Sequence, residues 1–303
     1  MGLRCDYHLH SQHSSDADTP MVEMAEAAWR AGLQELAFTD HLEWYGEDDA
    51  TGYLMPERYF AELRKVRAKY GQQLQLLAGL ELGSSHRFLP QARALLAAWP
   101  WDYILGAIHW AAGLPGWQPV AFAEGMERAY QRYFEELVLL AEEGEYDVLA
   151  HFDLVQRDAW TLCGRTLPIT PYKSLIHRAL KAVIARDKGL EINTSPWSMG
   201  LDDPAPGLTI LRWYRELGGE ILVLGSDAHR PGQVGQHFAR ARALAQAAGF
   251  TRFARFKKRN VVDWVQIGSG GRSEREVWKR EKREGKKEKG EKRREKLDSF
   301  LTI

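Results

Sequence analysis

Two short apolar stretches that end in histidine indicate the fold of this chain: residues 4–10 read RCDYHLH, and residues 36–41 read LAFTDH. Runs of this length and composition are typical of buried parallel β-strands. Similar runs recur along the chain, and the five others span residues 74–80, 103–108, 147–150, 190–194 and 221–225. The sequence therefore predicts seven parallel strands.

Longer amphipathic stretches lie between these runs, and several begin beside a proline, which helices tolerate in their first turn. Examples are residues 21–31 after Pro20, 57–70 after Pro56, and 172–187 after Pro171. The alternation of strands and helices predicts a parallel α/β architecture. Seven such units form either a closed barrel or an open, doubly wound sheet, and periodicity alone fits both.

The ends of the seven runs distinguish these architectures, because every run ends in a polar group. These groups are His8 and His10, Asp40 and His41, Glu81, His109, His151, Asn193, and Asp227 and His229. A barrel brings all strand C-termini into one mouth, whereas an open sheet gathers ligand groups between a few strands. We therefore expect a barrel with its active site at the C-terminal ends of the strands.

Imidazole and carboxylate donors without a thiolate are a ligand set for zinc, manganese or iron. His8 and His10 lie on one face of their strand, since alternate side chains point the same way. The donors outnumber the four that one tetrahedral ion takes, so we expect two or three metals that share carboxylates. A cluster of this kind suits in-line displacement at phosphorus.

The combined series resembles the PHP (polymerase and histidinol phosphatase) superfamily over about residues 4–260: His8-Leu9-His10, Asp40-His41, Glu81, His109, His151 and Asp227-Ala228-His229. The resemblance implies a distorted (β/α)7 barrel with three metal ions. It implies one ion held by His8, His10, Glu81 and Asp227, a second by Glu81, His109 and His151, and a third by Asp16, His41 and His229. It also implies catalytic roles for Glu81, Asp227 and His229, and for Asp40 a role in orienting His41 or in proton transfer.

Within the superfamily, two segments resemble the histidinol phosphatases: His151-Phe152-Asp153 followed by Arg157, and residues 191–195, which read EINTS. This resemblance implies hydrolysis of L-histidinol phosphate, a reaction of histidine biosynthesis, by direct attack of a hydroxide that bridges metal ions. The implied partner is a small phosphate ester, with Asn193 in contact with it.

Arg157 is expected to clamp the phosphoryl oxygens, because a guanidinium binds them in a bidentate manner. The family often has a second arginine after Asn-Thr-Ser, but this chain has Pro196-Trp197-Ser198 there, and Arg230 is the candidate substitute. Glu43, with Trp44 beside it, is the candidate for the amino and imidazole end of the substrate.

Two other functions stay open: a PHP phosphoesterase that acts on nucleotides or oligonucleotide ends, and a metal-binding interaction module without catalysis. Residues 268–303 hold 13 Lys and Arg against 8 Asp and Glu, which leaves 28 against 33 in residues 1–267. A mildly acidic body argues against nucleic-acid binding, which depends on clustered basic residues. A non-catalytic interaction module would be expected to have lost some metal ligands, and none is missing from the series.

The charge change also predicts two parts: a PHP phosphoesterase domain over residues 1–267, and a highly charged tail over residues 268–303 that is disordered or a solvated helix. A chain that ends at Val265 is expected to be as stable as the full chain. No stretch approaches the roughly 18 apolar residues of a membrane span, and no secretory leader is evident, so we expect a cytoplasmic protein. The sequence leaves the oligomeric state open.

Overall fold

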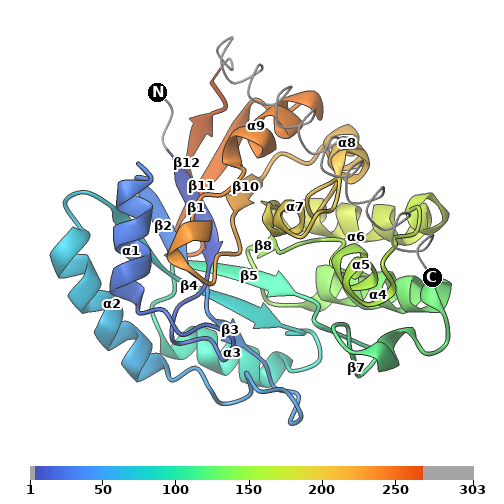
Figure 1. Cartoon of the computed structure of the whole chain (residues 1–303), viewed down its shortest axis with the longest axis horizontal. Coiled ribbons are helices and arrows are strands. Elements are labelled where there is room, and N and C mark those ends of the chain that lie inside the picture. Colours follow the sequence, from blue (N-terminus) through green and yellow to red (C-terminus); the bar gives the residue numbers. More distant parts are fainter. Residues whose placement is uncertain (1–3, 269–303) are drawn as a thin grey trace, which may run out of the picture.

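Seven parallel strands form a nearly closed barrel in the computed structural model, which describes residues 4–268 (Figure 1). The strands pair in the order of the chain: β1 (Cys5–Leu9), β2 (Glu35–Phe38), β4 (Gln75–Gly83), β5 (Tyr103–Ala107), β8 (Val148–Leu149), β9 (Gly189–Asn193) and β10 (Leu222–Gly225). The last strand returns to the first through a parallel bridge between Leu9 and Ala228. Two backbone hydrogen bonds of 2.8 Å flank it, from Asp227 N to His8 O and from His10 N to Ala228 O. The predicted seven-stranded barrel is confirmed.

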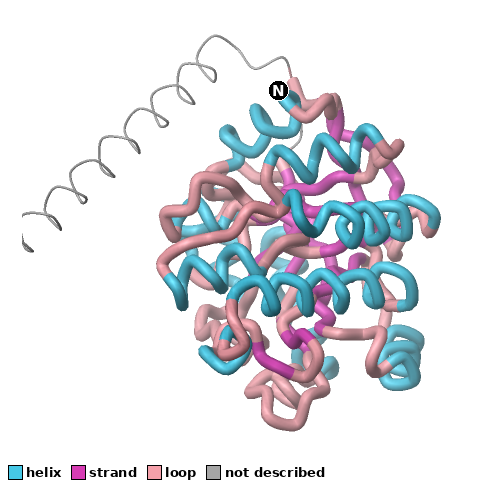
Figure 2. The backbone as a smooth tube through the Cα atoms, turned by 90° about the vertical axis from the view of Figure 1, so that its right-hand side faces the viewer, coloured by secondary structure: helices cyan, strands magenta, loops and turns pink. Residues whose placement is uncertain are grey.

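Helices surround the barrel on its outside (Figures 1 and 2). They are α1 (Met21–Arg30), α2 (Pro56–Tyr70), α3 (Leu89–Ala98), α4 (Met126–Glu143), α5 (Val155–Cys163), α6 (Lys173–Ala185), α7 (Ser195–Ser198), α8 (Leu208–Glu216) and α9 (Phe238–Ala247). Pro56 opens α2 as predicted, whereas Pro171 belongs to a 3-10 turn, Thr170–Tyr172, so that α6 begins at Lys173. None of these helices combines the length and the apolar composition that crossing a membrane requires.

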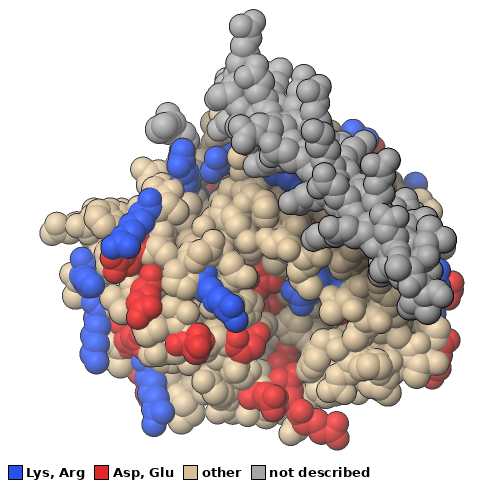
Figure 3. Space-filling view, viewed as in Figure 1, with Lys and Arg blue, Asp and Glu red and all other residues tan. Residues whose placement is uncertain are grey.

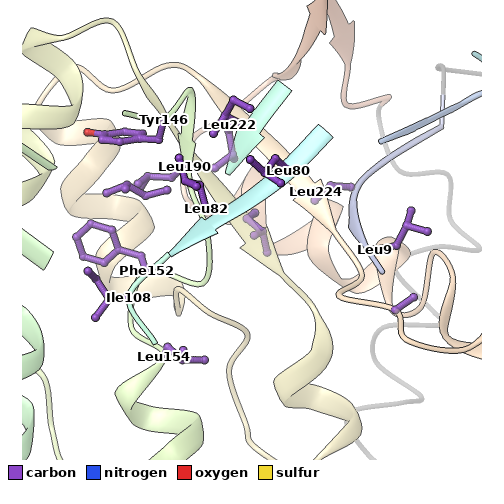
Figure 4. Close-up of a cluster of buried hydrophobic side chains, with 14 of the residues drawn as sticks. Leu9, Leu80, Leu82, Ile108, Tyr146, Phe152, Leu154, Leu190, Leu222 and Leu224 are labelled. Carbon is purple, nitrogen blue, oxygen red and sulfur yellow. The ribbon is translucent and has the colours of Figure 1, made fainter. Parts of the chain in front are cut away.

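The main hydrophobic core lies between the strands and the helices. Figure 4 shows part of it, including Leu80 and Leu82 on β4 and Leu222 and Leu224 on β10. These four leucines alternate with residues of the opposite face, as side chains do along a strand. Glu81 stands between the two leucines of β4 and therefore points into the barrel, toward the mouth.

A second, smaller core fills the barrel interior, because it takes side chains from six of the seven strands. A hairpin that the sequence did not predict, β11 (Arg252–Lys257) and β12 (Asn260–Gln266), adds to it. Phe256 of the hairpin packs its ring on Tyr7 and Tyr103, at centroid distances of 6.2 and 5.1 Å. The backbone N–H of Phe256 also donates to the Tyr7 hydroxyl, at 2.9 Å. The hairpin thus packs beside the N-terminal part of β1, away from the strand ends that carry histidine (Figure 1).

Short strands extend the mouth of the barrel. β3 (His41–Leu42) pairs in parallel with β4 and sets His41 opposite Glu81. β6 (Trp110–Ala111) and β7 (Leu114–Pro115) form a small antiparallel pair directly after His109. The polar residues that follow the strands are therefore held by regular structure on several sides.

The end of the hairpin corrects the expectation that the chain can stop at Val265. Ile267 is 7% exposed, and its backbone N–H donates to Thr251 O at 2.8 Å. A chain that ends at Gly268 is expected to have the melting temperature of the full chain, because residues 269–303, outside the described part, have few apolar side chains. A chain that ends at Val265 should melt roughly 5 °C lower, the scale expected for losing one buried isoleucine. Thermal melts by circular dichroism compare the two, and equal melting temperatures would show that Ile267 contributes nothing.

Candidate metal centre

The mouth of the barrel brings all nine predicted metal ligands together. Their donor atoms form four overlapping groups, and within each group the atoms lie within 4.8 Å of one another. The groups are His8, His10 and Asp227; His8, Glu81 and His151; His41, Glu81 and His109; and His10, Asp16, His41 and His229. The assignment of each group to one ion stays a prediction.

Glu81 lies at the centre of this arrangement and is 1% exposed. Its Oε2 lies 2.9 Å from His8 Nε2 and 3.1 Å from His41 Nδ1. Its Oε1 lies 2.8 Å from His151 Nε2 and 3.2 Å from His109 Nε2. The two carboxylate oxygens thus face different pairs of imidazoles, which is the placement that a carboxylate shared between two ions needs.

Asp227 has one oxygen toward the histidines and the other toward a cation. Its Oδ1 lies 3.2 Å from His10 Nε2, and its Oδ2 accepts from Arg157 Nη1 at 3.2 Å. Asp227 and His151 have positive φ angles of 54° and 24°. Residues other than glycine rarely adopt this backbone conformation. Strained backbone of this kind collects at functional sites, where the surrounding structure holds it.

Asp16 completes the outermost group from the loop after β1. Its Oδ2 lies 2.9 Å from His229 Nε2 and 3.4 Å from His41 Nε2, and the side chain is half exposed. His13, which is close to Asp16 in sequence, instead contacts Glu62 Oε2 at 2.9 Å. The structure therefore brings Asp16 rather than His13 to the other donors.

Seven of the nine donors, all except His8 and His10, line a cavity of about 420 Å³ that opens at the mouth. Arg157, from α5, lines the same cavity. The volume lies within the range of sites for small ligands.

The family model of the PHP domain matches residues 6–195. The chain belongs to the PHP domain family. A probable histidinol-phosphatase of Deinococcus radiodurans is 32% identical over 247 residues, which cover 78% of this chain and 90% of the relative. The histidinol-phosphatase of Lactococcus lactis is 26% identical over 259 residues, with coverage of 84% and 94%.

The fold of this PHP domain is also that of a solved structure. The crystal structure of histidinol phosphate phosphatase from Lactococcus lactis, complexed with zinc, L-histidinol and phosphate, superposes with a TM-score of 0.76. It is 23% identical and covers 86% of this chain and 99% of its own. This match supports the distorted barrel that the sequence predicts.

The charge of the PHP centre fits several divalent cations. Burial by itself would raise the pKa of Glu81, but the neighbouring His8, His41 and His109 hold it well below its usual range. Burial would also raise the pKa of Asp227, but this pKa is held well below its usual value by the neighbouring His8, His10 and Arg157. Two buried carboxylates that stay ionised among imidazoles are suited to cations.

Glu191, which the sequence analysis did not assign, orients His8 from behind. Its Oε1 lies 2.7 Å from His8 Nδ1, and its Oε2 accepts from the backbone N–H of His151 at 2.8 Å. A Cβ on Gly225 would lie 1.8 Å from Glu191 Oε1, so only glycine leaves room for this contact. A carboxylate on Nδ1 directs the Nε2 lone pair of an imidazole toward a metal, and such partners affect metal affinity strongly.

Glu43 holds His109 in the same way. Its Oε1 lies 2.6 Å from His109 Nδ1, and a Cβ on Gly83 would lie 1.7 Å from that oxygen. Glu43 is the residue expected from the sequence at the amino and imidazole end of the substrate. The structure buries Glu43 to 2% exposure and holds it against His109, so we infer that it positions this imidazole. Glu43 also lines the cavity, and its contact with the substrate stays a prediction.

Asp40 lies behind the centre and does not line the cavity. It is fully buried, and its carboxylate accepts from the backbone N–H and the hydroxyl of Ser11, at 2.5 and 3.0 Å. Ser14, in the same turn, lies 3.0 Å from His10 Nδ1 and accepts from the backbone N–H of His41 at 2.8 Å. We infer that Asp40 fixes this turn and thereby positions His10 and His41, which is one of the two roles expected from the sequence, and proton transfer stays a prediction.

Two predicted substrate contacts lie elsewhere. Asn193 is fully buried, and its Nδ2 donates to Glu191 Oε2 and Asp227 Oδ2, at 3.3 Å each, so it supports these two carboxylates. Arg230 is exposed and does not line the cavity. Neither residue lines the cavity, and contact of either with the substrate stays a prediction.

Zinc binding to the metal-free chain at pH 7 is expected to release protons. Burial opposes a charge on His229, but Asp16 and Asp227 raise its pKa to about 9, and the pKa values of His8 and His109 are also raised. These imidazoles therefore hold protons at pH 7 in the absence of metal, whereas a metal binds the neutral form. Zinc affinity should rise with pH up to about 9. Calorimetry in buffers of different ionisation enthalpy counts the protons, and zero release at pH 7 would contradict this reading.

Proposed function

We propose that this chain hydrolyses L-histidinol phosphate to L-histidinol and phosphate. The observation that carries the proposal is the convergence of nine imidazole and carboxylate donors at the mouth of the barrel, where seven of them line one cavity together with an arginine. Divalent metals held by such donors lower the pKa of bound water and neutralise charge that develops on phosphoryl oxygens. The relatives named above carry the same activity in their names.

We propose that Arg157 binds the phosphoryl group. It lines the cavity, and its side chain is 26% exposed. Its present partner is an anion, Asp227 Oδ2, at 3.2 Å. Because the guanidinium donates in a fixed fork, it suits the oxygens of a phosphate better than an ammonium does.

Asp227 is the carboxylate that we propose for proton transfer from the attacking water. Besides Arg157, its Oδ2 accepts from Asn193 Nδ2 at 3.3 Å and Ser195 Oγ at 3.1 Å, and these contacts fix its direction. Its other oxygen faces His10, so the same residue can hold an ion. A general base must lie within hydrogen-bond reach of the proton that it removes.

The rim of the cavity favours a cationic leaving group. Glu47 and Asp49 are exposed and line the rim next to Trp117, whose indole is 45% exposed. Figure 3 shows acidic side chains gathered on the lower part of this face. Among the lining residues in the described part of the chain, Arg157 alone is a lysine or arginine. This charge suits the ammonium group of histidinol and disfavours nucleotides and oligonucleotide ends, which bring additional phosphates.

A phosphate-release screen tests the proposal. The zinc-loaded full chain is assayed with L-histidinol phosphate, several nucleoside monophosphates and para-nitrophenyl phosphate. We expect kcat/KM for L-histidinol phosphate to exceed the other values by at least about tenfold, the scale of one charged contact. A preference for nucleotides would replace this substrate, and no turnover of any ester would favour the non-catalytic module.

A further inference from the structure

Asp16 is carried by the loop of residues 10–20, which connects β1 to α1. Its Oδ2 contacts His229 Nε2 at 2.9 Å and His41 Nε2 at 3.4 Å, and both imidazoles are predicted ligands themselves. An ion bound by these three side chains would replace the direct contacts between them. The loop must then hold Asp16 in position, because its side chain is half exposed.

Contacts within the loop bring its two ends together. The backbone N–H of Gln12 donates to Thr19 O at 2.8 Å. Closer to Asp16, the backbone N–H of Ala17 donates to Ser14 O at 3.4 Å, which is a long contact for a hydrogen bond. The position of Asp16 therefore depends on how the two ends of the loop are attached to the rest of the barrel.

Glu62, on α2, attaches both ends. Its Oε2 accepts from Gln12 Nε2 at 2.7 Å and lies 2.9 Å from His13 Nε2. Its Oε1 accepts from the backbone N–H of Met21, the first residue of α1, at 3.2 Å. That N–H is one of those at a helix start that have no partner within the helix. One carboxylate thus joins the residues before Asp16 to the helix that follows it.

The helix that carries Glu62 is itself fixed to the barrel. Tyr59, three positions before Glu62, is fully buried, and its hydroxyl donates to Phe38 O at 2.9 Å and accepts from the backbone N–H of Gly79 at 3.0 Å. These two partners belong to β2 and β4. The ring of Tyr59 also packs edge-on against His13, at a centroid distance of 5.7 Å. Glu62 therefore holds the loop from a rigid support.

We propose that Glu62 is a positioning residue for the ion of the outermost donor group, and that it acts through Asp16. By attaching both ends of the loop to α2, it orders Asp16 before the ion arrives, so that less conformational freedom is lost on binding. Residues that support a metal ligand typically change metal affinity by 10- to 100-fold. The inference rests on the metal centre that the proposed function requires, and it is independent of which ester is hydrolysed.

A zinc titration of the metal-free full chain, in competition with the chromophoric chelator 4-(2-pyridylazo)resorcinol, tests this role. It compares the wild type, Glu62→Ala, Asp16→Asn and the double variant. We expect Glu62→Ala to weaken one bound ion by at least about tenfold and to change the affinity of the others by less than about twofold. In the Asp16→Asn background the same substitution should change zinc affinity by less than about twofold, because the residue through which Glu62 acts is already altered.

Two further variants serve as controls. Glu57→Ala removes an exposed acid from the same helix and should leave zinc binding unchanged. Glu62→Gln keeps one accepting oxygen and should weaken the same ion less than Glu62→Ala does. Circular dichroism establishes that each variant is folded, and if Glu62→Ala is not, Glu62→Gln is compared in the two backgrounds in its place.

The proposal is overturned if loss of the Glu62 carboxylate leaves zinc binding unchanged or weakens every ion alike. It is also overturned if this loss costs as much affinity in the Asp16→Asn background as in the wild type, since Glu62 would then act on the fold rather than through Asp16. Each of these outcomes is read from zinc affinity alone. A failure to hydrolyse L-histidinol phosphate would therefore be distinguishable from a failure of this inference.

Discussion

Glu81→Gln is expected to lose bound metal together with turnover, because this carboxylate contacts imidazoles of several donor groups at once. Its two oxygens face His8 and His41 on one side and His109 and His151 on the other, at 2.8 to 3.2 Å. Glutamine keeps the shape but replaces one oxygen by an NH2 group and removes the charge that offsets two cations. We expect kcat to fall by more than about 100-fold, the upper cost of losing a group that only supports a ligand.

Asp16→Asn is the matched control for this prediction. Asp16 is also an acid of the donor set, but it is half exposed and contacts only His229 and His41. It should therefore disturb one ion, whereas Glu81→Gln should disturb two. Elemental analysis and kcat are measured for both variants. Full metal occupancy and near-normal turnover in Glu81→Gln would refute the shared-ligand arrangement.

Arg157→Ala is expected to keep its metal and lose catalysis. The guanidinium is the one positive side chain, among the described residues, that lines the metal-centre cavity, so its removal leaves the phosphoryl oxygens without a side-chain cation. The loss should amount to roughly 2 to 4 kcal/mol of transition-state stabilisation, or about 30- to 1000-fold in kcat/KM. Arg157→Lys should recover part of this, since it restores the charge but not the bidentate geometry.

Arg230→Ala separates this effect from a general loss of positive charge. Arg230 is exposed and lies outside the cavity, next in sequence to His229. Its removal should change kcat/KM by less than about twofold, as is usual for surface positions. If Arg230→Ala were as damaging as Arg157→Ala, Arg230 would be the second phosphate clamp after all.

The sequence predicted the barrel and the convergence of the donors for one physical reason. In a closed parallel barrel all strand C-termini meet, so polar residues at the ends of seven runs must face one another. His8 and Asp227, 219 positions apart, become neighbours because β10 closes on β1. Strand periodicity and end position were sufficient to predict this meeting.

The residues behind the ligands could not be predicted in the same way. Glu191 and Glu43 are buried on the inside of the barrel, and sequence spacing gives no indication of which imidazole nitrogen each one meets. Gly225 and Gly83 offer a weak signal, since a glycine in or next to a buried strand often marks a close approach. The hairpin of residues 252–266 was missed because it follows the seventh predicted strand, after which no further strand was expected.

The measurement that tests the central claim most directly is turnover of L-histidinol phosphate by the same protein before and after metal removal. The chain is stripped with a chelator, its zinc, manganese and iron content is determined, and phosphate release is measured before and after zinc is added back. We predict that activity disappears with the metal and returns with two to three ions per chain, as expected for donors that exceed one tetrahedral site. Full turnover in protein that contains no metal would contradict the account.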